Sequence, residues 1–283
     1  MDHRATLAGV SLGRGIPVVI MGALNVSPES FHAGSVHTEG DDLVATALAM
    51  VDAGASLIDI GARSTAPYGA SAIDDEEERC RLAHAVEALA AKLPVPVSAD
   101  TARVRPARAA LDAGARVIND VSGMRDPAMA ALVSERGAGV ILMALPKAAP
   151  SPTGPVATVK ALLNEAAQRA RIAGIPDKRI VLDPGIGFFR DERVVWDEWD
   201  SAVLAGLGQL EDLGRPLCIG VSRKSFLGAI TGRTHTEDRL AGSLAATAVA
   251  VWNGVALIRT HDVAETLDAV RVVERIRRAR GAL

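Results

Sequence analysis

An apolar run followed by a segment of helical periodicity recurs eight times along this chain of 283 residues. Short apolar runs are typical of buried strands, and several of the helical segments end at a glycine. Strands that alternate with helices pair in parallel through right-handed crossovers. Eight such units in this length favour one (β/α)8 TIM barrel over a doubly wound open sheet. We therefore expect an α/β protein with a single TIM-barrel domain over residues 1–283.

The repeat predicts where each element lies. We expect strands at residues 17–24, 57–61, 95–99, 116–118, 139–143, 180–182, 217–221 and 255–258. We expect helices at residues 41–53, 74–91, 103–113, 126–137, 158–173, 198–213, 236–253 and 262–280. Two short apolar patches around glycines predict an N-terminal β-hairpin arm within residues 1–16. The loops at 26–40 and 62–73 are longer than usual βα connections, and this indicates lids over a site.

The composition limits the class of protein further. Hydrophobic residues make up 49% of the chain but aromatic residues only 3%, as expected for parallel sheets covered by helices. The net charge of −3 is spread over both signs and gives no electrostatic case for nucleic acid or a membrane as partner. Cys80 and Cys218 stand far apart and suit reduced thiols. With no apolar run for a signal peptide or membrane span, we expect a cytoplasmic protein.

Polar residues stand where the expected parallel strands end, which is the active-site face of a TIM barrel. They are Asn25, Asp59, Asp100, Asn119, Asp183, Lys224, Arg259 and His261. Taken singly, Asp59 could accept hydrogen bonds from nearby backbone, and Asp100 or Asn119 could cap a helix. A whole ring of buried carboxylates and amides needs partners, and a ligand rich in donors and acceptors supplies them.

Four of these side chains suit a fused aminopyrimidinone ring. The carboxylates of Asp100 and Asp183 can each accept two parallel N–H bonds from a guanidine-like edge. The amide of Asn119 both donates and accepts, so it can recognise a neighbouring ring edge. Lys224 adds a donor for a ring carbonyl or nitrogen.

The other polar residues suit an anion. Arg259 and His261 are donors two residues apart, and Asn25 offers an oxygen to a hard cation such as Mg2+. At residues 219–228 an apolar run passes through Lys224 and Ser225 into a helix N-terminus, which also suits an anion. The sequence therefore predicts a heterocyclic substrate with a phosphate-ester leaving group.

Seven segments carry a recognisable pattern, in order along almost the whole chain. They are Met21-Gly22-Ala23-Leu24-Asn25-Val26-Ser27-Pro28-Glu29-Ser30-Phe31, Ile58-Asp59-Ile60-Gly61 with Ser64-Thr65, Ser98-Ala99-Asp100-Thr101, Ile118-Asn119-Asp120-Val121, Leu182-Asp183-Pro184-Gly185-Ile186-Gly187-Phe188, Ser222-Arg223-Lys224-Ser225 and Arg259-Thr260-His261-Asp262-Val263. Together they resemble the signatures of the dihydropteroate synthase family of pterin-binding enzymes. Seven co-linear motifs are far more specific than any one of them.

The resemblance implies a transferase of folate biosynthesis and a role for each matching residue. The enzyme would condense (7,8-dihydropterin-6-yl)methyl diphosphate with 4-aminobenzoate to 7,8-dihydropteroate and diphosphate, with Mg2+ as cofactor, sulfonamides as inhibitors and a homodimeric assembly. By this likeness the pterin contacts are Asp100, Asn119, Met143, Asp183, Phe188, Gly220 and Lys224, and the diphosphate contacts are Asn25, Thr65, Arg259 and His261, with Asn25 also the metal ligand. The aminobenzoate contacts are Phe31, Pro67, Arg223 and Ser225, and the catalytic residues are Asp100, Asp183, Lys224, Arg259 and His261.

Three positions depart from the family pattern. Ala66 stands where an arginine is usual, Glu29 replaces an aspartate, and Ala144 replaces a histidine. Since the first two loops shape the aminobenzoate pocket, we expect altered sulfonamide sensitivity. Two alternatives share the pterin contacts: a pterin-dependent methyltransferase, and a non-catalytic pterin-binding paralogue. The methyltransferase has no need of Lys224 and Ser225 arranged for an aryl acid.

Overall fold

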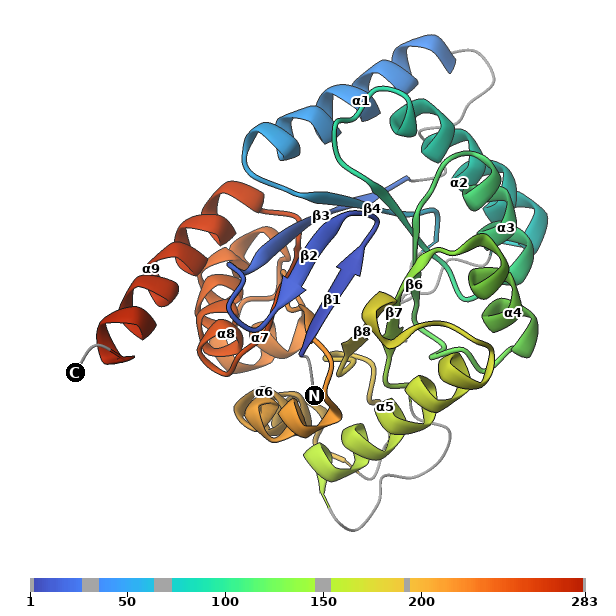
Figure 1. Ribbon diagram of the computed structural model, residues 1–283. Helices are drawn as coiled ribbons and strands as arrows, with labels where there is room; N and C mark the ends of the chain where they lie inside the picture. The colour runs from blue at the N-terminus through green and yellow to red at the C-terminus, as the bar shows by residue number, and fades with distance from the viewer. Residues whose placement is uncertain (1–2, 27–35, 64–72, 146–153, 191–193, 282–283) are drawn as a thin grey trace.

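The computed structural model describes residues 3–26, 36–63, 73–145, 154–190 and 194–281. Within these residues, eight parallel strands form a barrel, and a two-stranded sheet lies at one end of it (Figure 1). The parallel strands are β3 (Val19–Asn25), β4 (Leu57–Gly61), β5 (Val97–Asp100), β6 (Val117–Asp120), β7 (Gly139–Met143), β8 (Ile180–Asp183), β9 (Cys218–Gly220) and β10 (Leu257–Thr260). The TIM barrel predicted by the eightfold repeat is confirmed.

The strands follow the order β8-β7-β6-β5-β4-β3-β10-β9. A parallel bridge between Leu182 and Leu217 joins the two ends of the sheet, and the Leu182 N–H donates to the Pro216 carbonyl at 3.0 Å. The barrel is therefore almost closed. In register, Asn25 pairs with Gly61 and Gly61 with Asp100, so parallel pairing brings the carboxyl ends of the strands to one face.

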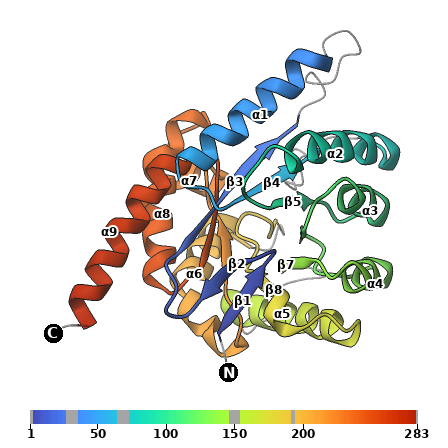
Figure 2. The same cartoon turned by 45° about the horizontal axis from the view of Figure 1, so that its top comes forward.

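Helices surround the barrel (Figure 2). They are α1 (Val36–Asp52), α2 (Asp75–Ala90), α3 (Val104–Asp112), α4 (Pro127–Arg136), α5 (Pro155–Ile172), α6 (Trp196–Ala205), α7 (Ser225–Thr231), α8 (Leu240–Trp252) and α9 (Val263–Gly281). Local chemistry explains the bounds of α4. The Asp126 carboxylate accepts a hydrogen bond from the Ala128 N–H at 2.9 Å, Pro127 opens the first turn, and Gly137 ends the helix in the left-handed conformation.

Two expected helices are shorter in the structure. The helix expected over 198–213 is α6 followed, after Gly206, by the 3-10 helix η3 (Leu207–Leu213). Gly206 lies so close to α5 that a Cβ would stand 2.4 Å from Cγ2 of Val156, and glycine is a poor helix former. The helix expected from residue 236 begins at Leu240, after the 3-10 turn η4 (Glu237–Arg239).

The predicted hairpin is the floor of the barrel. It consists of β1 (Arg4–Leu7) and β2 (Val10–Gly13), which pair antiparallel. Leu7 and Leu12 are fully buried in an apolar cluster with side chains from the amino-terminal ends of the strands, among them Leu57 and Val117. A larger apolar cluster involves both the strands and the surrounding helices. Because the hairpin fills this end, the opposite end of the barrel is left for a site.

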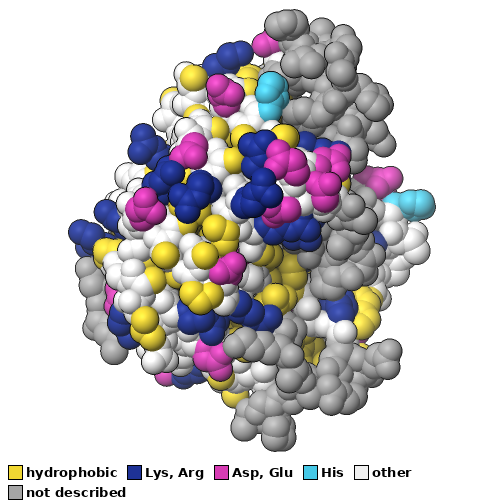
Figure 3. All heavy atoms as spheres, turned by 90° about the vertical axis from the view of Figure 1, so that its right-hand side faces the viewer, with side chains coloured by type: hydrophobic (Ala, Val, Ile, Leu, Met, Phe, Trp, Pro, Cys, Tyr) yellow, Lys and Arg dark blue, Asp and Glu magenta, His cyan; other side chains and the backbone are white. Residues whose placement is uncertain are grey.

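The helix layer carries charges of both signs. Figure 3 shows positive and negative side chains interspersed on the side where Figure 1 draws α2, α3 and α4. Some of them pair between helices, as Arg105 Nη2 and Glu76 Oε2 do at 2.8 Å. Within the described residues, no helix has both the length and the apolar character that a bilayer span requires.

Candidate active site

Five of the polar residues expected at the strand ends lie together inside the mouth of the barrel. Asp100 and Asp183 are the last residues of β5 and β8, and Asn119 and Arg259 are the last but one of β6 and β10. Asp59 lies two residues before the end of β4. In register, Asp100 pairs with Asn119, and Arg259 pairs with Gly220 on β9. Segments up to 200 residues apart are thereby brought to one face.

Arg259 is shared by two buried carboxylates. Its Nε donates to Asp59 Oδ2 at 2.6 Å and its Nη2 to Asp100 Oδ2 at 3.1 Å. Asn119 Nδ2 also donates to Asp59 Oδ2, at 3.1 Å. Burial raises the pKa of Asp100 to about 7, although Arg259 opposes this shift. Burial alone would lower the pKa of Arg259, but Asp59 and Asp100 raise it above its ordinary value, so the guanidinium stays charged.

Two carboxylate oxygens of this cluster have no partner among the described residues. Asp59 Oδ1 and Asp100 Oδ1 are buried without a hydrogen bond to any described residue. A buried acceptor without a donor costs about 1–3 kcal/mol. A ligand with N–H groups would supply the missing donors, as the sequence argument for an aminopyrimidinone requires.

The loop after β8 places Asp183 and Lys224 beside one another. Asp183 Oδ1 accepts from the Gly185 N–H at 2.7 Å, and Lys224 Nζ donates to the Ile186 carbonyl. The Lys224 ammonium also lies 5.1 Å from the centre of the Phe188 ring. Burial raises the pKa of Asp183 and lowers that of Lys224, while each charge partly opposes the shift of the other.

A strained turn between β9 and α7 orients Lys224. Arg223 adopts a left-handed φ of 57°, unusual for a residue with a side chain. Three contacts hold it: its N–H donates to Ser243 Oγ at 2.8 Å, its carbonyl accepts from Arg239 at 3.1 Å, and its Nε donates to Asp262 at 2.9 Å. The Arg223 guanidinium, expected to contact aminobenzoate, is therefore engaged by Asp262 in this structure.

Ser225, the first residue of α7, is hydrogen-bonded to Arg190, which in turn pairs with Asp200. Its Oγ accepts from Arg190 Nη2 at 3.0 Å, and Arg190 Nη1 lies 3.3 Å from Asp200 Oδ2. The Arg190 guanidinium also lies 4.3 Å from the centre of the Trp196 ring. Arg190 and Asp200 were not singled out from the sequence. Their position after the motif ending in Phe188 was the only signal that could have pointed to them.

Two of the residues expected to hold an anion, His261 and Asn25, lie at the rim. His261 is exposed, with Nδ1 3.1 Å from Ser222 Oγ. Burial of part of the ring, with Arg259 nearby, lowers the pKa of His261 to about 4, so it is neutral at pH 7. Asn25 is exposed at the end of β3. A Cβ on Gly61 would stand 3.2 Å from Asn25 Oδ1 and 3.7 Å from Asp100 Oδ2, so this glycine leaves space between them.

The remaining expected residues divide into two groups. Met143 is buried at the end of β7, and a Cβ on Gly220 would lie 3.7 Å from Cβ of Arg259, so both lie at the mouth. Phe31, Thr65 and Pro67 lie outside the described residues, as do the departures Glu29 and Ala66.

Comparison with known proteins agrees with this geometry. Residues 21–261 match the pattern of the family described as pterin binding enzyme. The chain is 38% identical over 272 residues to the dihydropteroate synthase of Escherichia coli K12, with 94% of each sequence covered. It is 40% identical over 259 residues to a probable bifunctional folylpolyglutamate synthase/dihydropteroate synthase of Haloferax volcanii, covering 89% of this chain but only 30% of that protein. The structure of Xanthomonas albilineans dihydropteroate synthase with 4-aminobenzoic acid aligns with a TM-score of 0.86 and 39% identity, covering 98% of this chain and 99% of that chain.

Proposed function

The chain belongs to the family of pterin-binding enzymes, and from this membership we infer that it catalyses the synthesis of 7,8-dihydropteroate. The substrates are (7,8-dihydropterin-6-yl)methyl diphosphate and 4-aminobenzoate, and the second product is diphosphate. The observation that carries this inference is the Asp100 carboxylate oxygen that has no partner among the described residues, inside a mouth that also holds Asn119, Asp183 and Lys224. The aminobenzoic acid in the related structure supports the second substrate.

We place the pterin deep in the mouth. Asp100 and Asp183 accept its N–H groups, Asn119 recognises the neighbouring ring edge, and Lys224 donates to a ring carbonyl or nitrogen. The pterin ring can stabilise the cation that forms when the C–O bond to diphosphate breaks. The Asp183 carboxylate beside the ring favours that cation electrostatically. The amine of aminobenzoate then attacks the methylene carbon and releases a proton.

We place the leaving diphosphate at the rim. Arg259 contributes a charge that remains at any ordinary pH, and neutral His261 contributes a hydrogen bond. The aminobenzoate carboxylate lies at Ser225 and the start of α7, where Arg190 supplies a positive charge. In this scheme the chain needs no nucleophile, since positioning and electrostatic stabilisation account for the catalysis.

We also propose that Mg2+ accompanies the diphosphate. Within the described residues no group of three His, Cys, Asp or Glu side chains could hold a metal. A diphosphate-bound Mg2+ needs only one or two protein ligands, because phosphate oxygens and water complete its shell. The exposed Asn25 oxygen beside the space at Gly61 fits that role. When bound, the ion would neutralise charge on the leaving group.

The decisive experiment measures dihydropteroate formation from the two substrates by the wild type, Lys224→Ala and Asp183→Ala. We expect turnover in the wild type and at least a hundredfold loss of kcat/KM in each variant, from a lost charge-assisted contact. Pterin binding without product would favour the non-catalytic paralogue. Methyl transfer to a corrinoid protein, without dihydropteroate formation, would favour the methyltransferase.

Two further properties belong to this proposal. Exposed apolar side chains on α8 and α9 (Val249, Trp252, Val272 and Ile276) support a homodimer through these helices.

The two cysteines, exposed Cys80 and buried Cys218, are unpaired, as suits a protein of the reducing cytoplasm.

We also propose that this protein discriminates against sulfonamides, because Ala66 replaces the usual arginine of the second loop. Inhibition constants for a sulfonamide and KM values for aminobenzoate would be compared with those of the Escherichia coli enzyme. A higher ratio of inhibition constant to KM is expected, and equal ratios would contradict the proposal.

A further inference from the structure

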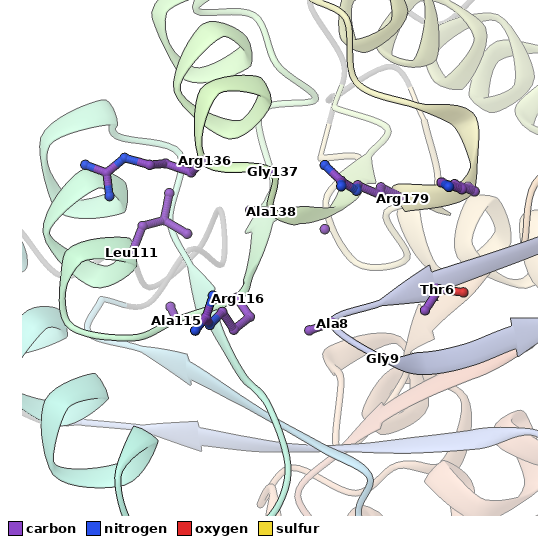
Figure 4. Close-up of a pocket in the computed structure, with 12 residues that line it drawn as sticks. Thr6, Ala8, Gly9, Leu111, Ala115, Arg116, Arg136, Gly137, Ala138 and Arg179 are labelled. Carbon is purple, nitrogen blue, oxygen red and sulfur yellow. The ribbon is translucent and has the colours of Figure 1, made fainter.

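A basic cavity lies at the floor of the barrel, on the face opposite the candidate active site. Its volume is about 680 Å3, and its walls include the hairpin turn at Ala8 and Gly9 and the loops that precede β6 and β7 (Figure 4). Four cationic side chains line it: Arg116, Arg136, Lys178 and Arg179. None of its lining residues, all in the described part of the chain, carries a carboxylate side chain. In a chain of net charge −3, this concentration of positive charge is local.

One of the four cations is already neutralised. Arg136 Nη1 lies 2.5 Å from Asp112 Oδ1 on α3, and Arg136 stands in the last turn of α4, where the helix dipole favours a cation. Arg116, Lys178 and Arg179 form no side-chain hydrogen bond or ion pair with another residue that the structure describes. Their mutual repulsion is therefore not relieved within the described chain.

The acid next to Lys178 in the sequence is engaged elsewhere. Asp177 belongs with Lys178 to the 3-10 turn η2 (Asp177–Arg179), yet its carboxylate pairs with Arg215 at 2.5 Å and Arg171 at 3.4 Å. Neither arginine lines the cavity.

The walls hold the free guanidinium groups on two sides of one space. Figure 4 shows Arg116 and Arg179 on either side of the gap, and Arg136 directed away toward α3. Gly137, with φ of 62°, lets the Arg179 side chain lie close, since a Cβ there would stand 3.1 Å from Nη1. Leu111, Ala115 and Ala138 add an apolar wall.

We propose that this cavity binds a small molecule that carries a diphosphate or triphosphate group. Guanidinium groups bind phosphate oxygens in a forked geometry, and three unneutralised cations match a polyanion better than a single carboxylate. The volume is typical of small-ligand sites and exceeds what phosphates alone fill, so the apolar wall can take an organic body such as a nucleoside. The site is separate from the mouth of the barrel and independent of the proposed reaction.

The test is calorimetric titration of the wild-type protein with ATP and, separately, with inorganic diphosphate, both without Mg2+ at low salt. The Arg116→Gln/Arg179→Gln double variant should bind ATP at least about tenfold more weakly, because two charge-assisted contacts are lost. A matched control, Lys92→Ala/Lys160→Ala, removes two cations that do not line the cavity and should bind as the wild type does. Synthase kcat and KM should stay within twofold in both.

Diphosphate also has a place in the proposed active site, so its titration reports the number of sites. We expect one more site in the wild type and the lysine control than in the arginine variant. Tighter binding of ATP than of diphosphate at the lost site would identify an organic phosphate, and equal binding an inorganic one. If thermal melting shows that the double variant is unfolded, Arg116→Gln alone, at an exposed loop position, replaces it. Unchanged ATP affinity in the folded variant, or no ATP binding by the wild type, overturns the proposal.

Discussion

Single residues at the mouth carry more buried negative charge than their internal partners neutralise. Asp100 shows this most clearly, because it shares Arg259 with Asp59 and keeps one oxygen without a partner in the described part of the chain. Its pKa is about 7 in the folded protein against an ordinary value of 3.8. The folded state therefore holds the proton more tightly than the unfolded state. The stability that this gives is present below pH 4 and is lost as the pH rises through 7.

Asp100→Asn should consequently stabilise the protein at high pH, since it removes a buried charge but keeps the shape. We expect the free energy of unfolding at pH 8 to rise by about 1–3 kcal/mol, and the gain to shrink at pH 5. Urea denaturation at the two pH values measures it. The control Asp268→Asn, whose side chain is 79% exposed, should change the free energy of unfolding by less than about 0.5 kcal/mol. A loss of stability in Asp100→Asn at pH 8 would contradict the charge imbalance. Synthase activity should fall, because the pterin loses an ionised acceptor.

Gly187 leaves the space that the Lys224 side chain occupies. It has φ of 87°, and a Cβ there would stand 3.0 Å from Cδ of Lys224. Gly187→Ala should therefore displace Lys224 and lower kcat/KM about tenfold or more, with about 1–2 kcal/mol of backbone strain. Gly232→Ala is a matched control: φ is 71°, but nothing lies within 4 Å of its Cβ position. Steady-state kinetics and urea denaturation should show similar strain in both variants and a loss of activity in the first alone.

At the scale of elements, the hairpin and β7 interlock at the floor. A Cβ on Gly139 would stand 2.8 Å from Cδ2 of fully buried Leu7. Leu7→Ala should cost about 2–4 kcal/mol and Gly139→Ala about 1–3 kcal/mol. The double variant should cost at least 1 kcal/mol less than their sum, because the alanine methyl enters the space that Leu7 vacates.

Urea denaturation of the four proteins in this cycle measures the coupling. Exposed Ser11→Ala on β2 should be nearly neutral. The turnover of the folded variants should match the wild type, since the floor lies at the other end of the barrel from the active site. If the free-energy costs of Leu7→Ala and Gly139→Ala simply add in the double variant, the packing of Leu7 does not depend on the absence of a side chain at Gly139.

Some helices and strands could be predicted from the sequence better than others. The eight strands were predictable because each is a short apolar run, and α4 because Asp126, Pro127 and Gly137 mark its ends locally. The break after α6 had a local signal in Gly206, but the close approach of Gly206 to Val156, fifty residues away in the chain, was not predictable.

At the scale of the whole molecule, barrel topology explains why the members of the site could be found. Parallel strands bring Asp100, Asn119 and Asp183 to one face whatever their separation in the chain. Which groups touch was not predictable: acceptance from nearby backbone was one possible role of Asp59, but its carboxylate pairs with Arg259, 200 residues away. Such pairing depends on strand register and side-chain direction inside the barrel.

The proposed homodimer is a property of the whole molecule and can be tested on α8 and α9, which lie side by side (Figure 1). Val272 and Ile276 are one helical turn apart on α9 and are 59% and 52% exposed. Val272→Asp/Ile276→Asp would place two carboxylates in an apolar interface, where unpaired charge is costly to desolvate. We expect the dimer dissociation constant to rise at least a hundredfold, equivalent to about 3 kcal/mol, in sedimentation equilibrium at micromolar concentration.

Ile172→Asp on α5, at a position 79% exposed, makes the same chemical change away from α8 and α9 and should remain dimeric. A wild-type monomer, or a double variant that stays dimeric, would remove these helices as the interface. Each monomer should keep its synthase activity, because every described residue of the candidate site lies within one barrel.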